Sequence, residues 1–315
     1  MPSERSWRRR AWLGGAGLAG VGSLGALAYS ASPRFWRHVI EEKSHPILPP
    51  PARPQPRRRP DRGLYAAWLG HTTVLLSIDG FTVLTDPIFS ERCGLDFRLF
   101  TVGIKRLVAP ALLPRELPRI DLVLLSHAHM DHFDLPSLRT LESPHTTVIT
   151  ASQTSDLLRV RRYRAVHELG WGGQARVGDL LCRAFEVNHW GARLRTDTWR
   201  GYNGYVLETG RWRILFAGDT AWTPAFRSLR GSRPLHLAIM PIGTYNPWVR
   251  NHCTPEQAWR MGNDAGAEFF LPVHHQTFPL SREPVGEPIE RFHAAAGRQT
   301  DRVALDTIGR EFRIT

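Results

Sequence analysis

The feature that most constrains this chain is a group of four metal-ligating side chains within six residues. His127, His129, Asp131 and His132 follow directly behind the apolar segment 121–126. In an extended backbone His127 and His129 project to one side, because they lie two residues apart. Imidazole and carboxylate groups are ligands of zinc and of neighbouring transition metals. A polar loop with hydrogen-bonded histidines is the alternative, but the pattern predicts a metal site where a buried strand ends in a loop.

Three later apolar segments end in residues of the same kind. The segments are 182–187, 213–217 and 268–273. They lead into His189, into Asp219, and into the pair His274 and His275. Taken singly, each is explained by a turn aspartate or by a histidine bonded to backbone. Binding residues often lie on loops that a rigid sheet positions, so the recurrence predicts one shared site.

Local patterns predict two sheets with helices outside them. Two pairs of β-type segments are each joined by a turn dipeptide typical of hairpins. They are 73–78 with 81–85, across Asp79-Gly80, and 204–208 with 212–216, across Thr209-Gly210. A short helix is expected over 135–141, with Pro136 in its first turn. Another begins at Pro255, with Thr254 as its N-cap.

The N-terminal part differs in composition from the rest. We interpret residues 1–32 as a signal or membrane anchor, because a basic start precedes the uncharged stretch 11–31. Arg9-Arg10 resembles a twin-arginine export signal. Cleavage near Ala28 and retention as an anchor both remain open. Residues 33–62, rich in Pro and Arg from 44 onward, are expected to form a linker. The globular domain is predicted to span 63–315. These features predict a cell-envelope protein, exported to the periplasm or anchored.

The charge of the chain is concentrated at this end. Residues 1–62 contribute +8 of the formal net charge of +12. No nucleic-acid recognition motif accompanies the basic residues, so we expect no nucleic-acid partner. A membrane surface reached through the N-terminus fits better. The three cysteines have no C-x-x-C spacing and are odd in number, so the sequence predicts neither a disulfide framework nor a thiolate zinc site.

Between about residue 64 and residue 290 the chain resembles the metallo-β-lactamase superfamily. The similar motifs are S-H-A-H-M-D-H at 126–132, N-H-W-G-A-R at 188–193, F-A-G-D-T at 216–220 and P-V-H-H-Q-T-F at 272–278. Three further segments resemble the branch that contains N-acyl-phosphatidylethanolamine-hydrolysing phospholipase D and the ascorbate-6-phosphate lactonases. These are 68–72, 241–248 and 252–258. The resemblance implies an α+β fold, the four-layer αββα sandwich of this superfamily.

The resemblance also implies a dinuclear zinc site, in which iron or manganese could replace zinc. By analogy one ion is held by His127, His129 and His189, and the other by Asp131, His132 and His274. Asp219 would bridge the two ions. The phospholipase pattern has one histidine before Trp-Gly-Thr-Phe, whereas this chain has His274 and His275. Alignment on Thr277-Phe278 makes His274 the ligand.

The function implied is hydrolysis by a metal-bridging hydroxide. Two metal ions lower the pKa of a shared water and polarise the bond to be cleaved. We expect Asp131, Asp219 and His252 to be the catalytic residues. His71 could contact the site or form a structural bond within its loop. His252 could contact the substrate or cap the following helix. Five aromatic residues could line an acyl pocket or simply pack. They are Trp171, Trp190, Trp222, Tyr245 and Trp248.

Three functions are compatible with these residues. The first is a phosphodiesterase of the N-acyl-phosphatidylethanolamine phospholipase D type, acting on a lipid substrate. The second is a hydrolase of a small lactone, ester or phosphorylated sugar, which a narrow basic pocket would favour. The third is a non-catalytic metal-binding envelope protein, and the full set of ligand residues argues against it. The oligomeric state does not follow from the sequence.

Overall fold

The computed structural model describes residues 45–315. The predicted signal or anchor at 1–32 and the first part of the predicted linker, 33–44, lie outside the described residues. The chain clusters into two units, Met1–Pro46 and Ile47–Thr315, and the fold below is that of the second. No helix within 45–315 is long and apolar enough to cross a membrane.

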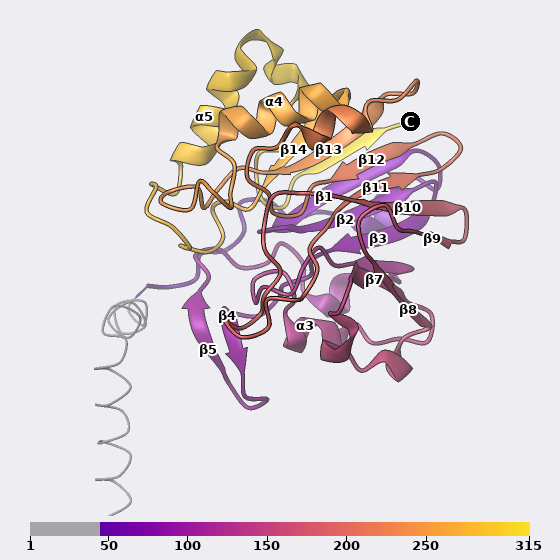
Figure 1. The fold of residues 1–315 in the computed structure, drawn as a ribbon, viewed down its shortest axis with the longest axis vertical. Helices are drawn as coiled ribbons and strands as arrows, with labels where there is room; N and C mark the ends of the chain where they lie inside the picture. The colour runs from indigo at the N-terminus through magenta and orange to yellow at the C-terminus, as the bar shows by residue number, and fades with distance from the viewer. Residues whose placement is uncertain (1–44) are drawn as a thin grey trace, which may run out of the picture. The chain divides into compact units, whose positions relative to one another are not determined.

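Two mixed sheets dominate this unit (Figure 1). The seven-stranded sheet has the order β15-β1-β2-β3-β6-β7-β8. Its strands are β1 (Leu64–Gly70), β2 (Thr73–Ile78), β3 (Phe81–Thr85), β6 (Leu122–Leu124), β7 (Thr147–Ala151), β8 (Ala165–Leu169) and β15 (Glu311–Ile314). The six-stranded sheet has the order β14-β13-β12-β11-β10-β9. Its strands are β9 (Gln174–Val177), β10 (Leu180–Phe185), β11 (Gly204–Glu208), β12 (Arg213–Phe216), β13 (Leu235–Pro241) and β14 (Ala267–Val273).

Both predicted hairpins are confirmed. β2 pairs with β3 in antiparallel register, Leu75 opposite Leu84, and β11 pairs in the same way with β12. In the first turn Asp79 and Gly80 both have positive φ, 48° and 86°. Two successive residues with positive φ match the right-handed twist of the flanking strands, which explains why Asp-Gly suits this turn. A third antiparallel pair, β4 (Arg92–Asp96) with β5 (Thr101–Lys105), forms a separate hairpin that projects from the domain (Figure 1).

The helices complete the predicted four-layer sandwich. One apolar core lies between the sheets and includes Trp68, Leu124 and Phe216. A second core lies between the six-stranded sheet and two helices, α4 (Pro255–Ala265) and α5 (Glu287–Ala296). On the opposite side α3 (Leu135–Thr140) packs against the seven-stranded sheet (Figure 1). The order is therefore helix, sheet, sheet, helix.

The helix starts follow local chemistry. The Thr254 side chain accepts from the Gln257 backbone N–H, and Pro255 occupies the first turn of α4. Asp134 caps α3 in the same way, through the Ser137 backbone N–H. Side-chain oxygens at these positions satisfy N–H groups that have no partner inside the helix. The predicted helices at 135–141 and from Pro255 are thus confirmed.

Part of the segment that we predicted as a linker packs against the domain. The Leu48 N–H donates to Leu107 O at 2.8 Å, and the Ala109 N–H donates to Leu48 O at 2.8 Å. Farther along, the Ala52 N–H donates to Ile308 O at 3.2 Å. Pro54 and Pro56 are buried. Proline-rich composition indicates extended backbone, but it does not reveal that two neighbouring loops of the domain bind this backbone.

Candidate metal site

The candidate ligands stand at strand ends that meet at one edge of the sandwich. β3, β6, β7 and β8 run parallel to one another, as do β12, β13 and β14, so their carboxyl ends lie together. The loop after β6 holds the H-x-H-x-D-H motif, and the loop after β10 holds His189. Asp219 follows β12, and His274 follows β14 directly. The structure thus brings together the residues that the sequence placed at separate strand ends.

One group of converging side chains contains His127, His129, His189 and Asp219. The His127 Nε2 lies 2.8 Å from the His129 Nδ1, which lies 3.3 Å from the His189 Nε2. Asp219 Oδ2 is 4.0 Å from His127 Nε2 and 3.8 Å from His189 Nε2. The four ligand atoms lie within 4.8 Å of one another, close enough to share one ion.

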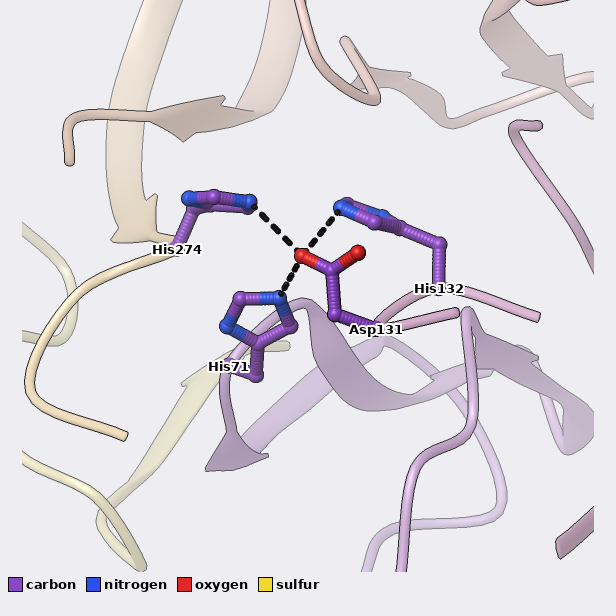
Figure 2. A group of neighbouring side chains, drawn as sticks. All are labelled: His71, Asp131, His132 and His274. Carbon is purple, nitrogen blue, oxygen red and sulfur yellow. Dashed lines mark hydrogen bonds and ion pairs between the residues drawn. The ribbon is translucent and has the colours of Figure 1, made fainter. Parts of the chain in front are cut away.

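A second group contains His71, Asp131, His132 and His274 (Figure 2). Asp131 Oδ2 lies 3.4 Å from the Nε2 atoms of both His132 and His274, and 2.9 Å from the His71 Nε2. Asp219 Oδ2 reaches the same two histidines, at 3.1 Å from His132 and 3.2 Å from His274. Asp219 therefore lies between the two groups, the position expected of a bridging carboxylate.

The second nitrogen of four candidate ligands has a hydrogen-bond acceptor. His132 Nδ1–H donates to Asp86 Oδ2 at 2.7 Å, and His127 Nδ1–H donates to Ser126 Oγ at 2.8 Å. His189 Nδ1–H donates to Asn251 O at 2.8 Å, and His274 Nδ1–H donates to Thr244 Oγ1 at 3.2 Å. Each bond fixes the ring's orientation and leaves the Nε2 lone pair facing the site, as metal-ligating histidines require.

These residues fit metal ions because several inward-facing atoms have no other partner. The Nε2 atoms of His132 and His274 and the Oδ1 atom of Asp219 are buried without a hydrogen bond. Buried polar atoms are normally paired, so a convergent set of unpaired acceptors needs an explanation. A cation between them would satisfy these atoms together.

The pKa values are consistent with this view. Burial lowers the pKa of His127 well below its usual range and that of His129 to about 3, so both rings are neutral and have a free lone pair. Burial opposes charge on Asp131 and Asp219, but the nearby His132 holds the pKa of both carboxyls well below the ordinary value. Against the effect of burial, Asp219 and Asp131 raise the pKa of His132 well above its usual range and that of His274 to about 9. The buried Asp219 and the largely buried Asp131 thus face five candidate histidine ligands, and their negative charge favours positive charge between them.

The backbone around the site is strained. His71, Asp86, Thr244 and His274 have φ values of 52°, 29°, 67° and 64°, in the left-handed region that few non-glycine residues adopt. Strain of this kind persists where the surrounding structure enforces it, and it concentrates at functional sites. Gly218 has φ 59°, and a Cβ there would lie 2.8 Å from Ser126 Cβ. The glycine before Asp219 therefore lets the end of β12 approach the His127 loop.

A cavity of about 400 Å³ opens onto both groups. Its lining includes Trp190, Trp248 and Leu280 beside candidate metal ligands such as Asp131 and Asp219. Of the five aromatic residues considered from the sequence, Trp190 and Trp248 line this cavity. Tyr245 instead donates to Glu287 Oε1 at 2.8 Å, and Trp171 Nε1–H donates to Tyr202 O at 2.7 Å.

His252 lies in the same cavity and not at the helix start. Its Nδ1 is 3.7 Å from Asp219 Oδ2, buried and without a hydrogen-bond partner. Burial lowers the pKa of His252 well below its usual range, so the ring is neutral. Thr254, not His252, caps α4. The structure thus places His252 beside the candidate metal ligands, where it can contact a substrate.

The two adjacent histidines after β14 have different surroundings. His274 reaches Asp131 and Asp219, as described above. His275 packs against Trp68 with ring centroids 4.7 Å apart and the rings tilted by 32°, and neither of its ring nitrogens has a side-chain partner. The structure therefore places His274 among the converging residues and His275 outside them, as the motif alignment predicted.

Two contributors to the site were not identified as such from the sequence. Asp86 binds three groups at once: the Ser126 N–H at 2.7 Å, the Ser126 O–H at 2.5 Å and the His132 Nδ1–H. Asp86 directly follows β3, just as other candidate site residues follow the ends of apolar strands, so the same sequence pattern could have identified it. Arg193 donates to Ala128 O at 3.1 Å and to Phe133 O at 2.8 Å, and so ties the loop after β10 to the motif loop.

Comparison with known proteins gives the family. A family model described as "Beta-lactamase superfamily domain" matches residues 82–275. An uncharacterized protein of Mycobacterium tuberculosis is 33% identical over 282 residues, which cover 87% of this chain and 74% of that protein. N-acyl-phosphatidylethanolamine-hydrolyzing phospholipase D 1 of Caenorhabditis elegans is 26% identical over 274 residues, covering 78% of this chain and 76% of the relative.

A solved structure shows the same fold. It is an isothiocyanate hydrolase from Delia radicum gut bacteria, with a TM-score of 0.64 and 18% identity, covering 80% of this chain and 99% of that one. Together with the family match, this similarity confirms the predicted resemblance and fold. The chain belongs to the beta-lactamase superfamily, and its fold and His/Asp clusters are those of a metal-dependent hydrolase of the metallo-β-lactamase type.

Proposed function

We propose that this protein is a dinuclear metal-dependent phosphodiesterase that cleaves the headgroup phosphodiester of N-acylated ethanolamine phospholipids. The observation that carries the proposal is the cavity of about 400 Å³, in which tryptophan and leucine side chains stand beside two His/Asp groups. An apolar wall beside a candidate metal site suits a substrate with a charged phosphate and acyl chains. The similarity to the C. elegans phospholipase D supports the same substrate class.

Two ions are proposed because the ligand atoms form two groups around Asp219. His127, His129 and His189 would hold one ion, Asp131, His132 and His274 the other, and Asp219 both. Zinc is the first choice for a set of imidazole and carboxylate ligands, with iron and manganese as alternatives. When bound, a metal pair of this kind supplies Lewis-acid polarisation of a phosphoryl oxygen and a water that is acidic enough to attack at neutral pH.

The protein side chains have separate tasks in this reaction. Asp219 is the carboxylate closest to both groups, so its free Oδ1 can accept the proton of the attacking water. His252, 3.7 Å from Asp219 and neutral, can contact the phosphoryl group or the leaving oxygen from the cavity side. Trp190 and Trp248 exclude water from one side of the cavity and can pack against acyl chains. His71 holds the Asp131 carboxylate through its Nε2–H.

The proposal is tested by measuring activity and metal content on one preparation. Substrates would be N-acyl-phosphatidylethanolamines of increasing acyl length, a bis-aryl phosphodiester, a lactone and a sugar phosphate. We expect two metal ions per chain, phosphodiester cleavage, and activity that rises with chain length, because each buried CH₂ adds about 0.8 kcal/mol of binding. Trp248→Ala should flatten that dependence and leave the metal content unchanged.

Other results would contradict the proposal. A metal content of one ion or none under metal-replete conditions would exclude the dinuclear site. Fast turnover of the lactone or sugar phosphate, with no cleavage of either phosphodiester, would favour the small-molecule hydrolase instead. Full metal occupancy without turnover of any substrate would favour a binding protein.

A further inference from the structure

Most of the large apolar side chains that stay exposed within residues 45–315 lie in three loops. Nine of thirteen such residues do so. The first is the outer end of the β4–β5 hairpin, including Leu95 at the end of β4; the second follows β10 and the third follows β13. The nine residues are Leu95, Phe97, Leu99 and Phe100 in the first loop, Trp190, Leu194 and Trp199 in the second, and Trp248 and Val249 in the third. We call these nine residues the apolar rim.

Two of the three loops line the mouth of the candidate active site, and the β4–β5 hairpin is joined to its wall. Trp190 and Trp248 line the cavity directly, as does Leu280. Leu280 packs on a small core with Cys93 and Ile104 at the base of the hairpin. The hairpin and the second loop both contact the segment that runs from the motif loop into α3, since Asp96 binds Arg139 and Arg193 donates to Phe133 O. Figure 1 shows the β4–β5 hairpin extending beyond the rest of the domain. Two loops of the rim thus line the cavity, and the hairpin is attached beside it through Leu280.

The hairpin tip is apolar, exposed and held in shape. Leu99 is 94% exposed, Phe100 60% and Phe97 54%. The Phe97 and Phe100 rings stack with centroids 5.2 Å apart, and the Phe97 N–H donates to Phe100 O at 2.9 Å. The tip thus presents its apolar groups to solvent without packing them against the described part of the chain. Contiguous exposed apolar surface of this kind marks an interaction site.

Each loop of the rim also carries an arginine whose guanidinium forms no salt bridge in the described structure. These are Arg98, Arg195 and Arg250, all exposed. The acidic residues of the first two loops are already paired within the domain. Asp96 binds Arg139, and Asp197 binds Arg200 at 2.6 Å. Facing outward, the rim therefore combines aromatic and aliphatic groups with unpaired positive charge.

We infer that the apolar rim is a membrane-docking surface, which inserts into the interfacial layer of an anionic phospholipid bilayer and holds the cavity mouth against it. Tryptophan and phenylalanine side chains place their rings at the level of the headgroups, and arginines bind lipid phosphates. The route of the substrate rests on the proposed function: a lipid phosphodiester would enter the cavity from the bilayer. Membrane contact is thereby assigned to the folded domain itself and not only to the N-terminal segment.

The shape and charge of the rim favour a bilayer over a second copy of the chain. Each of the three loops carries an exposed arginine, so a two-fold contact between two copies of the chain would bring like charges together. A bilayer with anionic lipids accepts both the apolar side chains and the positive charge. A self-association surface is retained as an outcome of the test below.

The decisive experiment places a probe on the hairpin tip of the full-length protein. Cys93, Cys182 and Cys253 are buried, so Leu99→Cys supplies an exposed thiol for an environment-sensitive fluorophore. Val160→Cys, also exposed but outside the rim, is the matched control. With vesicles of equal parts phosphatidylcholine and phosphatidylglycerol, we expect a blue shift at position 99 and none at 160. Binding through the N-terminal segment alone would leave the probe at 99 in water and overturn the inference. A shift without vesicles that grows with protein concentration would show self-association and also overturn it.

Binding of variants measures the contribution of each part of the rim. The triple variant Phe97→Ser, Leu99→Ser, Phe100→Ser should bind these vesicles at least about tenfold more weakly than the parent protein. The pair Leu48→Ser, Val160→Ser, which removes exposed apolar groups elsewhere, should bind like the parent. Replacing Arg98, Arg195 and Arg250 by Gln should weaken binding about fivefold per arginine, and only when phosphatidylglycerol is present. Equal binding by all these variants would contradict the inference.

Activity separates this inference from the proposed function. On a soluble bis-aryl phosphodiester the hairpin variant should match the parent, whereas on vesicle-borne substrate it should be slower by the factor lost in binding. Vesicle docking without phosphodiester turnover would leave the rim as a membrane surface and refute the proposed reaction. Phosphodiester turnover without a blue shift at position 99 would support the proposed reaction and refute the rim as a membrane surface.

Discussion

The two ends of the β-sandwich differ in how they use charged residues. At the site end the loops are long, and the charged groups are buried and converge. At the opposite end three tight turns, at Asp79-Gly80, Gly178-Asp179 and Thr209-Gly210, enclose a cavity of about 910 Å³. We call this the turn end. The cavity at the turn end is lined by four exposed arginines, Arg119, Arg164, Arg176 and Arg211.

The comparison shows that cavity size does not identify the functional site. The cavity at the turn end has more than twice the volume of the cavity at the site end. The site end is distinguished by buried histidine and aspartate atoms without partners, and four non-glycine residues there, His71, Asp86, Thr244 and His274, have positive φ, against Asp79 at the turn end. The arginines of the turn end stay in water, where a charge is stable without a ligand. Desolvated acceptors, in contrast, require a cation or a hydrogen-bond donor.

The largest effect should come from Asp219, where the two ligand groups meet. Asp219→Asn removes the negative charge between them, so we expect activity to fall by more than about a thousandfold and the metal content to drop. Asp179→Asn, at the turn end, is the matched control and should leave both unchanged. Metal analysis and steady-state kinetics on the two variants check this. Full metal content in Asp219→Asn would show that this carboxylate is not a shared ligand.

Residues 47–62 test how far the stability of the domain depends on a segment that packs against it from outside the sandwich. Leu48 bonds to Leu107 and Ala109, and the Leu107 N–H in turn donates to Thr277 O at 2.7 Å, close to His274. The Gln55 N–H donates to Glu311 Oε1 at 2.6 Å. A fragment of residues 63–315 should fold but unfold with a free energy about 2–4 kcal/mol below that of 47–315, because several backbone hydrogen bonds are lost. Denaturant unfolding of both fragments measures this. Equal stabilities would mean that 47–62 is a linker after all.

Asp86 should have a smaller effect, because it acts through His132. Asp86→Asn can still accept the Ser126 N–H but no longer offers a charged acceptor to His132 Nδ1–H. We expect metal affinity or activity to fall about 10- to 100-fold, as for other residues that orient a metal ligand. Asp79→Asn, in a turn whose positive φ suits asparagine, is the control and should behave like the parent. The test is a metal competition titration, and unchanged affinity in Asp86→Asn would remove its positioning role.

The smallest effect should come from the turn end. Replacing Arg164, Arg176 and Arg211 by Gln should change the free energy of unfolding by no more than about 0.5 kcal/mol, because exposed arginines that form no salt bridge contribute little. Activity on the soluble phosphodiester should stay at the parental level. A large loss of activity would break the comparison, since the turn end would then influence the site across the length of the sandwich.

Much of the fold and of the site followed from the sequence because its signals are local. A two-residue turn such as Asp79-Gly80 determines its hairpin through the φ values of those two residues. Thr254 and Pro255 mark a helix start through hydrogen bonds within one turn. The H-x-H-x-D-H run shows its chemistry because its ligand atoms belong to neighbouring residues. The repetition of His or Asp after apolar segments extended the prediction to His189, Asp219 and His274.

Only the tertiary structure decided how the candidate ligands are held and what surrounds them. Asp86 orients His132 across 46 positions of the chain, and Asn251 accepts from His189 across 62. Such pairs depend on how strands and loops pack, and a hydrogen-bond acceptor in a loop has no sequence pattern of its own. The same holds for the apolar rim. For Trp190 and Trp248 the sequence left an acyl pocket and ordinary packing both open, and it did not single out Phe97. Only the packing of the other side chains leaves all three exposed.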